Sequence, residues 1–306
     1  MDCCHRTCPS GFLDKNADRP LACLQANCFG KFSTQVVRET VLARPIITLT
    51  TDYGTSDHLV GTMKGVILGI NPEAEIVDIT HSISPYDVLD AALTINQASR
   101  YFPSRTIHIV VVDPGVGTAR RPLLVTAGTQ FYIAPDNGVL SLVYEREKES
   151  ITARHITADH YFLRPISNTF HGRDIFAPVG GALSKTWQTA SFGDQIEDFV
   201  KLTLPKPKVT GNVVKGIVLR VDAYGNLVTN LMPEDVPSLK AGNGKVKVLV
   251  GNQEVGKMVR TFADGAQGEP IALIGSSGFL EFAINKGDAA KALKANRGAE
   301  VTVELK

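Results

Sequence analysis

The sequence predicts an α/β domain with a largely parallel central sheet, followed by a smaller β-rich domain built as a sandwich or a barrel. In the first part, apolar runs of strand length alternate with helix-like segments. In the second part, short strands follow one another and are separated by Gly, Asn and Asp turns. A Pro- and Lys-rich segment at 201–208 lies between the two patterns and indicates a linker. We therefore expect domains at 44–200 and 209–306.

The elements of the first domain follow from runs of apolar residues and from the turns between them. The run at 107–112 is apolar and β-branched apart from His108, which is typical of a buried strand. Strands are predicted at 45–50, 75–79, 107–112, 123–126 and 131–134. Helices are predicted at about 56–69, 87–101, 137–144 and 175–183, the first with Ser56 as a candidate N-cap.

The second domain shows shorter runs of alternating polarity. Strands are predicted at 213–221, 227–230, 246–250, 258–262, 271–274, 279–284 and 300–304. Turn-forming pairs such as Gly225-Asn226 and Ser277-Gly278 separate several of them. This spacing favours a sandwich or a barrel.

Composition limits the function classes. The chain has 306 residues, enough for about two domains with their own cores. It contains 43% hydrophobic and 21% charged residues, as in soluble globular proteins. The formal net charge is +1 without a long basic run, so neither a nucleic acid nor an anionic membrane is expected as a partner. No apolar stretch approaches the roughly 20 residues that span a bilayer.

All five cysteines lie in the first 28 residues. The rest of the chain needs no disulfide, which suits a reducing cytosol and predicts a cytoplasmic protein. The spacings of these cysteines do not match the paired C-x2-C pattern of structural zinc sites. We expect residues 1–43 to form a poorly ordered extension, or to lie upstream of the true functional start.

The most informative segment is 111–121, where a buried strand ends in an acidic residue, a Pro-Gly turn and two arginines. Open α/β sheets bind ligands at the carboxyl ends of their strands, which is where Asp113 and Arg120 are expected. A structural interpretation remains open, since an Asp can cap a turn and an Arg can form a surface ion pair.

Other loops have the same two interpretations. Asp52 and Asp57 flank a turn after the first strand, and turn chemistry accounts for one of them more easily than for both. Asp222 and Asn226 bound a turn that could be a plain hairpin. His171, at the start of a predicted helix, is a candidate catalytic or ligand-binding residue, although many histidines are ordinary polar residues.

Seven segments carry a family resemblance when they are taken together and in order. They are 51–57 (TDYGTSD), 81–86 (HSISPY), 112–120 (VDPGVGTAR), 132–138 (YIAPDNG), 169–173 (TFHGR), 222–226 (DAYGN) and 276–280 (SSGFL). In these segments the chain resembles the S-adenosyl-L-methionine hydroxide adenosyltransferase family, which is related to fluorinase and chlorinase enzymes. The resemblance runs from about Pro45 to the C-terminus.

The resemblance implies that water, as hydroxide, displaces L-methionine from C5′ of S-adenosylmethionine and gives adenosine. The family's catalytic set falls on Asp113, Arg120 and His171. Arg120 is expected to stabilise the hydroxide, while Asp113 and His171 orient the water and handle its proton. No metal and no cofactor are implied, because the thioether leaves as a neutral group.

Substrate contacts are also implied by the resemblance. Asp52 corresponds to the acceptor of both ribose hydroxyls, and Asn226 to the side chain that reads the adenine edge. Residues at the methionine end and aromatic residues against the nucleoside complete the set: Asp57, Asp222 and Ser276, then Tyr86, Tyr224 and Phe262. Ser277 stands where the halogenating relatives carry an arginine, so the grip on the methionine carboxylate differs here.

The resemblance further implies a homotrimer whose sites lie between subunits. Halide-dependent adenosyl transfer is an alternative, but the carboxylate of Asp113 replaces a tyrosine of the fluorinase and repels a halide. The chain also lacks the long insertion of the fluorinating branch after Arg121. A module that binds S-adenosylmethionine without turnover, or an interaction protein that acts through its cysteine-rich tail, are further alternatives.

Overall fold

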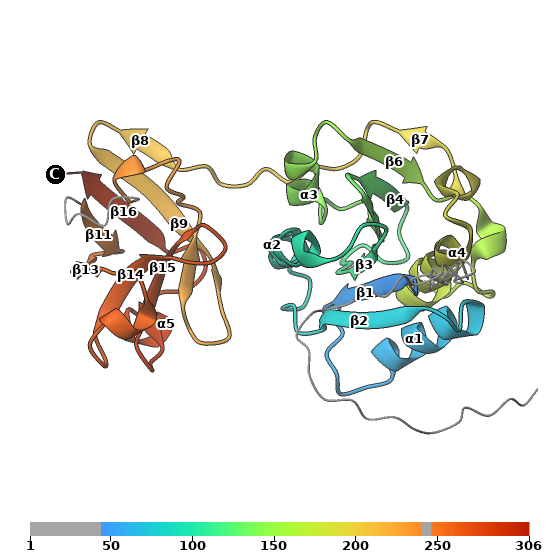
Figure 1. Ribbon diagram of the computed structural model, residues 1–306, viewed down its shortest axis with the longest axis horizontal. Helices are drawn as coiled ribbons and strands as arrows, with labels where there is room; N and C mark the ends of the chain where they lie inside the picture. Colours follow the sequence, from blue (N-terminus) through green and yellow to red (C-terminus); the bar gives the residue numbers. More distant parts are fainter. Residues whose placement is uncertain (1–43, 240–245, 306) are drawn as a thin grey trace, which may run out of the picture. The chain divides into compact units, whose positions relative to one another are not determined.

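The computed structural model describes residues 44–239 and 246–305 (Figure 1). The predicted extension at 1–43 lies outside these residues. The described chain forms one sheet of seven strands in its N-terminal part and one of nine strands in its C-terminal part. No helix of the two described ranges is long and apolar enough to cross a membrane.

The N-terminal sheet is parallel at one side and antiparallel at the other. Its strand order is β2-β1-β3-β5-β4-β6-β7, and the pairs among β2, β1, β3 and β5 are parallel. The bounds are β1 (Ile46–Thr51), β2 (Glu75–Thr80), β3 (Ile107–Val111), β4 (Pro122–Ala127), β5 (Gln130–Pro135), β6 (Ile151–His155) and β7 (Gln195–Ile196). The predicted class, an α/β domain with a largely parallel sheet, is confirmed, while β6 and β7 were not predicted.

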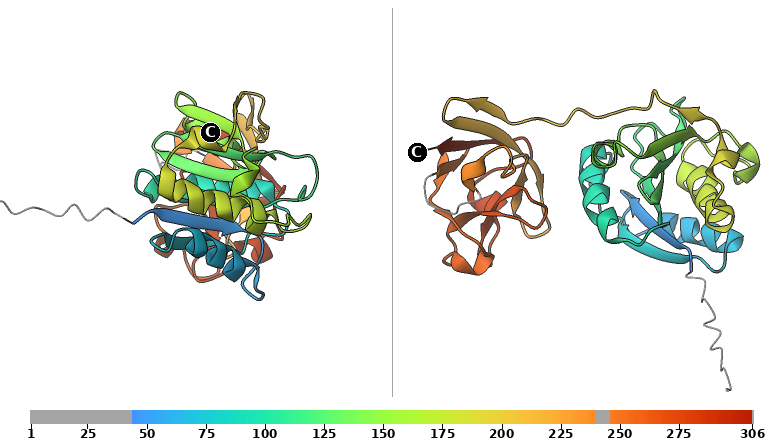
Figure 2. Two further views of the ribbon diagram at one scale, coloured as in Figure 1. Left: turned by 90° about the vertical axis from the view of Figure 1, so that its right-hand side faces the viewer. Right: turned by 45° about the horizontal axis from the view of Figure 1, so that its top comes forward.

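Helices cover both faces of this sheet (Figures 1 and 2). Alternate side chains of β3 enter two different cores, Ile107 and Ile109 on one face and Val110 on the other, as a strand with period two requires. The first core includes residues of α1 (Leu59–Ile70) and α4 (Ala177–Thr186); the second includes residues of α2 (Val88–Ala98) and α3 (Ser141–Arg146). The loops after β1, β2 and β3 are therefore left at one edge of the sheet.

The start of α1 differs from the prediction. The helix begins at Leu59 rather than near residue 56. The Oδ1 atom of Asp57 accepts a hydrogen bond from the N–H of Leu59, the first residue of the helix, at 3.0 Å. Asp57, and not Ser56, therefore provides the side-chain acceptor at this helix start. Asp57 and Ser56 both lie in an exposed turn, and sequence alone does not separate two adjacent capping candidates.

The C-terminal sheet curls into a barrel-like domain around its own apolar core, which confirms the predicted β-rich class (Figure 1). Its path is β12-β11-β16-β9-β10-β15-β14-β13, with β8 paired to β9. The bounds are β8 (Lys208–Thr210), β9 (Val213–Val221), β10 (Leu227–Thr229), β11 (Val246–Val250), β12 (Gln253–Val255), β13 (Lys257–Met258), β14 (Pro270–Ile274), β15 (Leu280–Ile284) and β16 (Glu300–Leu305). A short helix, α5 (Ala289–Ala292), precedes β16.

The strand predicted at 258–262 is wrong. Only Lys257–Met258 is a strand there, and Phe262–Asp264 forms a 3-10 turn. A capping box stabilises that turn, because Thr261 and Asp264 exchange hydrogen bonds between side chain and backbone. As a result Phe262 projects from a turn and is half exposed.

His108 is a titratable group in the centre of the sheet. It is fully buried on β3, its Nδ1 lies 2.7 Å from Thr48 Oγ1, and its ring stacks on Tyr132 with 4.9 Å between centroids. Burial lowers the pKa of His108 from 6.5 to about 3. The folded protein therefore holds this histidine neutral over most of the acidic range.

We predict that His108 makes the fold sensitive to acid. Below pH 6.5 the unfolded chain takes up a proton that the folded chain does not, so stability falls as pH falls. Between pH 7 and pH 5 this one group removes about 2 kcal/mol. His108→Phe keeps a ring against Tyr132 but abolishes the titration. Urea unfolding at both pH values should show about 2 kcal/mol less acid loss in His108→Phe, whereas His58→Gln, at an exposed histidine, should match the wild type. Equal acid losses in all three proteins would contradict the prediction.

Candidate active site

The loops after β1 and β2 are joined by hydrogen bonds. Asp52 Oδ2 accepts the backbone N–H of Tyr86 at 2.9 Å, and Gly54 N–H donates to the His81 carbonyl at 2.8 Å. Tyr86 has φ 68°, a conformation that non-glycine residues rarely adopt, and its side chain is 73% exposed. The Asp52 carboxylate is thus held in place, and an aromatic ring is presented beside it.

The loop after β3 returns Arg120 onto Asp113. Arg120 Nε lies 2.9 Å from Asp113 Oδ2, and Nη2 also donates to that oxygen. Both side chains are buried, at 9% and 5% exposure. The turn between them needs Gly117, which has φ +77° and would place a Cβ only 2.2 Å from the carbonyl oxygen of Asn168. The predicted pair at the strand end is therefore a buried ion pair rather than a surface one.

Arg120 also contacts His171, which comes from a distant part of the chain. Its Nη2 lies 2.7 Å from His171 Nδ1. Because a guanidinium can only donate, Nδ1 is the acceptor, and we assign the ring proton to Nε2. Burial, and then the charge of Arg120, lowers the pKa of His171, which favours the neutral ring. The three predicted catalytic side chains thus form one hydrogen-bonded series.

The backbone after His171 is unusual. Residues Gly172–Phe176 form a π-helix that continues directly into α4, where the sequence indicated an ordinary helix beginning at 175. Such π-turns are rare and occur often at functional sites, because they re-aim the side chains around them. Here both His171, just before the π-turn, and Phe176, at its end, contact the Arg120 guanidinium: Nη2 lies 2.7 Å from His171 Nδ1, and Cζ lies 5.2 Å from the Phe176 ring centre.

One donor of Arg120 is left over. Its Nη1 is buried and has no hydrogen-bond partner within the described residues. A buried charged donor without a partner costs free energy, so this atom is suited to bind an oxygen that is not part of the protein.

Tyr53 belongs to this site although sequence reasoning gave it no role. Burial, then the carboxylates of Asp52 and Asp113, raises its pKa well above the ordinary value. Its hydroxyl lies 2.6 Å from the point where a Cβ of Gly172 would stand. Its position directly after Asp52, at the end of a strand, could have indicated a place in the site. An aromatic residue at such a position is, however, normally assigned to the hydrophobic core.

The C-terminal domain carries a second group of predicted residues. A cavity of about 990 Å³ is lined only by residues of this domain, among them Asp222, Tyr224, Asn226, Phe262 and Ser276. Tyr224 is largely exposed, as is about half of Phe262. Large exposed aromatic side chains around a cavity are typical of a binding surface.

Asp222 is occupied by its own loop. Its Oδ1 accepts the N–H groups of Tyr224 and Asn226 at 2.8 and 2.9 Å, and its Oδ2 accepts Asn226 Nδ2 at 2.9 Å. This carboxylate therefore fixes the Asn226 side chain. The hairpin interpretation and the functional interpretation of this loop are compatible, because the turn orients an amide toward the cavity wall.

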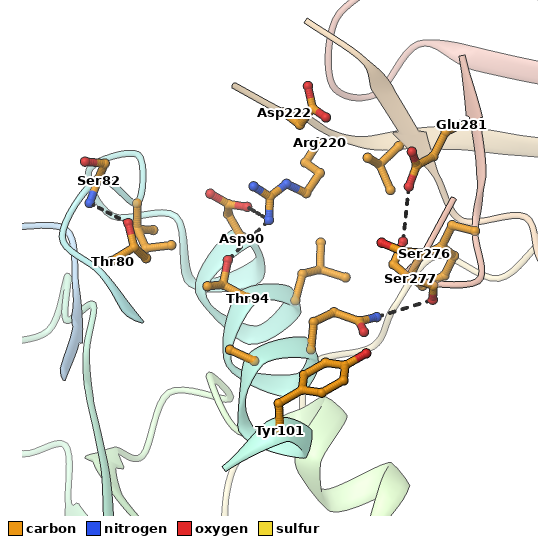
Figure 3. A pocket seen from close by; sticks show the side chains of 16 residues that line it. Thr80, Ser82, Asp90, Thr94, Tyr101, Arg220, Asp222, Ser276, Ser277 and Glu281 are labelled. Atoms are coloured by element: carbon orange, nitrogen blue, oxygen red, sulfur yellow. Dashed lines mark hydrogen bonds and ion pairs between the residues drawn. The ribbon is translucent and has the colours of Figure 1, made fainter. Parts of the chain in front are cut away.

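Ser276 and Ser277 lie in the turn between β14 and β15, beside a second cavity shared with α2 (Figure 3). The Ser277 carbonyl accepts Gln97 Nε2 at 3.4 Å, and the Ser277 hydroxyl donates to Glu281. Arg220 and Asp90 also line this second cavity, and they form an ion pair at 3.1 Å.

The predicted residues form two groups. Asp52, Tyr86, Asp113, Arg120 and His171 lie in the N-terminal part, and the C-terminal cavity holds the others except Asp57 and Ser277. Asp57 bonds the first turn of α1. Within 44–239 and 246–305, no hydrogen bond connects the two groups, and no cluster of three or more His, Cys, Asp or Glu is arranged to hold a metal ion.

Comparison with protein-family models gives two consecutive matches. Residues 47–193 match the SAM hydroxide adenosyltransferase N-terminal domain, and residues 216–302 match the corresponding C-terminal domain. The chain is 34% identical over 265 residues to an (R)-S-adenosyl-L-methionine hydrolase of Salinispora tropica, covering 85% of this chain and 97% of the relative. A hydrolase of the same name from Methanocaldococcus jannaschii is 32% identical over 272 residues, with 84% and 95% covered.

Two further likenesses matter. A fluorinase of an Actinoplanes species is 31% identical over 292 residues, covering 85% of this chain and 97% of that enzyme. The crystal structure of an uncharacterized conserved protein from Thermotoga maritima superposes with a TM-score of 0.79 and 38% identity, covering 84% of this chain and 99% of the other.

We predict that Gly172 is required because Tyr53 occupies the space of its missing side chain. Gly172→Ala places a methyl group 2.6 Å from the Tyr53 hydroxyl and 3.1 Å from Met63 Sδ. We expect a loss of about 1–3 kcal/mol in urea unfolding. Tyr53→Phe in the same chain removes the closer contact and should restore part of that loss.

The control is Gly61→Ala, in α1, where a Cβ meets nothing within 4 Å. It should leave stability unchanged or raise it by up to about 1 kcal/mol. Equal instability of Gly172→Ala with and without Tyr53→Phe would show that the hydroxyl is not the obstacle.

Proposed function

This chain belongs to the SAM hydroxide adenosyltransferase family, and on that premise we propose that it hydrolyses S-adenosyl-L-methionine to adenosine and L-methionine. The observation that carries the proposal is the buried series Asp113–Arg120–His171 at the end of β3. The water oxygen forms a bond to C5′, the C5′–S bond breaks, and its electron pair leaves on sulfur. One proton of the water is released.

The reaction needs a positioned oxygen nucleophile more than it needs an acid, because the leaving thioether is neutral. Arg120 supplies the positive charge beside that oxygen, and its unpartnered Nη1 is available to donate to it. His171 cannot act as the base while Nδ1 accepts from Arg120, so its Nε2–H orients the water. Asp113 is then the group in the series that can take the proton.

Substrate binding is assigned to both groups of residues. Asp52, fixed by the Tyr86 N–H, accepts the ribose hydroxyls, and the Tyr86 ring packs on the nucleoside. In the C-terminal cavity, Asn226 reads the adenine edge between Tyr224 and Phe262. Ser276 and Ser277 face the methionine end, to which Asp57 and Asp222 are also assigned. No cofactor and no metal are part of this proposal, since displacement of a neutral thioether needs neither.

We propose that the complete site forms between subunits of a homotrimer. Each half exposes aromatic rings, Tyr86 in the N-terminal part and Tyr224 and Phe262 in the C-terminal part. A nucleoside bound between the 44–200 domain of one chain and the 209–306 domain of its neighbour would cover all three of these aromatic rings. A cytoplasmic location is proposed with it, because the chain beyond residue 28 has no cysteine.

Halide-dependent transfer is the competing activity, because some relatives carry the name fluorinase. The carboxylate of Asp113 disfavours an anionic halide next to Arg120, whose charge it already neutralises.

We predict that purified protein releases adenosine and L-methionine from S-adenosylmethionine, detected by chromatography. Asp113→Ala and His171→Ala should each lower kcat by about 100-fold or more, because the first removes the group that takes the proton and the second removes the donor that orients the water. Asp52→Ala should raise KM first, since it removes the acceptor for the ribose hydroxyls. Added chloride or fluoride should give no 5′-halogenated adenosine. Near-native kcat in both Asp113→Ala and His171→Ala would place water activation elsewhere.

A complementation experiment tests the shared site. Asp113→Ala inactivates the N-terminal half-site and Asn226→Ala the C-terminal one. We expect each variant alone to be nearly inactive, and a mixture refolded together to recover activity, because some sites then join two intact halves. The control is a mixture of Asp113→Ala with His171→Ala, both in the same half, which should stay inactive. Lack of recovery together with a fully active monomer in light scattering would refute the shared site.

A further inference from the structure

Three carboxylates line the C-terminal cavity, and they differ in what they already bind. Both oxygens of Asp222 accept hydrogen bonds from its own loop. Asp288 accepts the Lys291 N–H at 2.9 Å and pairs with Lys291 Nζ at 3.0 Å, so it caps α5. Among the residues that the structure describes, Glu281 has a single hydrogen-bond partner, the Ser277 hydroxyl, which lies 3.2 Å from Oε1. Of the carboxylates around this cavity, Glu281 is the one with an oxygen still available.

Glu281 is also the most buried of the three carboxylates, although it has the fewest hydrogen-bond partners. It lies on β15 and is only 9% exposed. Its carboxylate lies against the backbone of Gly275, where a Cβ would stand 1.9 Å from Oε1 and 2.5 Å from Oε2. Figure 3 shows Glu281 directed toward the turn with Ser276 and Ser277. The missing side chain at residue 275 therefore creates the space that this carboxylate occupies.

The charged groups around Glu281 do not provide its carboxylate with a cation of its own. Burial, then the nearby Asp222 carboxylate, raises the pKa of Glu281, and Arg220 lowers it. Arg220 is itself engaged with Asp90 at 3.1 Å and with Thr94 Oγ1 at 3.2 Å. A buried carboxylate in this state lacks a cation, and a ligand that brings one would offset the cost of its burial.

We propose that Glu281 binds the α-ammonium group of the methionine part of the substrate. This rests on the proposed function, and it adds a binding residue that the family resemblance did not assign. An ammonium group has three donors and no acceptor, so it needs acceptor oxygens that are not already used. Glu281 offers one beside Ser276, whose hydroxyl is suited to donate to the neighbouring methionine carboxylate, while the Ser277 hydroxyl already donates to Glu281. Asp222, which is also assigned to the methionine end, has both of its oxygens already accepting hydrogen bonds from its own loop.

The test measures product binding by calorimetry with three probes: L-methionine, adenosine, and 4-(methylthio)butanoate, which is methionine without its ammonium group. In Glu281→Gln, affinity for L-methionine should fall by about 10- to 100-fold, the usual effect of removing one partner of a buried charge pair. Affinities for adenosine and for the des-amino probe should not change. The wild type should therefore prefer methionine to its des-amino analogue, and the variant should not.

Gly275→Ala provides a second variant that keeps the charge but displaces the carboxylate, and it should give the same selective loss. Glu269→Gln, at an exposed glutamate of the same domain, is the matched control and should behave like the wild type. The wild type alone gives a third measurement. Because burial raises the pKa of Glu281, the carboxylate loses its negative charge at a higher pH than an ordinary glutamate does. As the pH is lowered, the preference for methionine over the des-amino probe should therefore begin to decline before the ordinary pKa of a glutamate is reached.

Several results would overturn the proposal: unchanged methionine affinity in Glu281→Gln, an equal loss for adenosine, or no preference of the wild type for the ammonium-bearing probe. Adenosine release from S-adenosylmethionine is assayed separately on the wild type. If that release is absent while the methionine preference depends on Glu281, the proposed function fails and the ammonium site stands. If release is present and the preference is absent, the reverse holds.

Discussion

The site depends on one cation, Arg120, that is buried between an anion and a neutral ring. A buried guanidinium is costly unless its donors are used, and Asp113 and His171 use all but those of Nη1. The surroundings of Arg120 also decide the state of His171, because burial, then the positive charge of Arg120, lowers the pKa of His171, and a donor aimed at Nδ1 leaves no place there for a proton. The geometry of the pair therefore sets the roles that the surrounding groups can take.

Close backbone approaches hold that cation in place. Gly117 lets the loop after β3 contact Asn168, and Gly172 leaves room for the Tyr53 hydroxyl next to His171. Both contacts connect segments that are distant in sequence but meet where parallel strands end at one edge of the sheet. The π-turn at Gly172–Phe176 then places His171 and Phe176 around the guanidinium. The geometry of the candidate site therefore depends jointly on the loop after β1, the loop after β3 and the segment around His171.

The fold class was predictable because strand and helix periods are local signals. The strand before Asp113 and the barrel strands follow directly from alternating or continuous apolar runs. Features set by particular side-chain contacts were not predictable, such as the capping box that replaces a strand near Phe262. The candidate catalytic residues could be named from motifs. The tautomer of His171, the role of Asp222 in orienting Asn226 and the available oxygen of Glu281 could not, because they depend on distances that no motif contains.

The charge balance of the proposed reaction explains why Arg120 is paired with Asp113. Hydroxide and a sulfonium carry opposite charges and form neutral products, so charge decreases along the reaction coordinate. A site of low polarity favours such a step, because it stabilises separated charges less than water does. An isolated arginine would hold hydroxide tightly and oppose its transfer to C5′. Paired with an ionised Asp113 until that carboxylate takes the proton, Arg120 can orient the water without holding a preformed hydroxide tightly. The buried pair therefore provides hydrogen-bond direction with little net charge, which is the condition that this displacement requires.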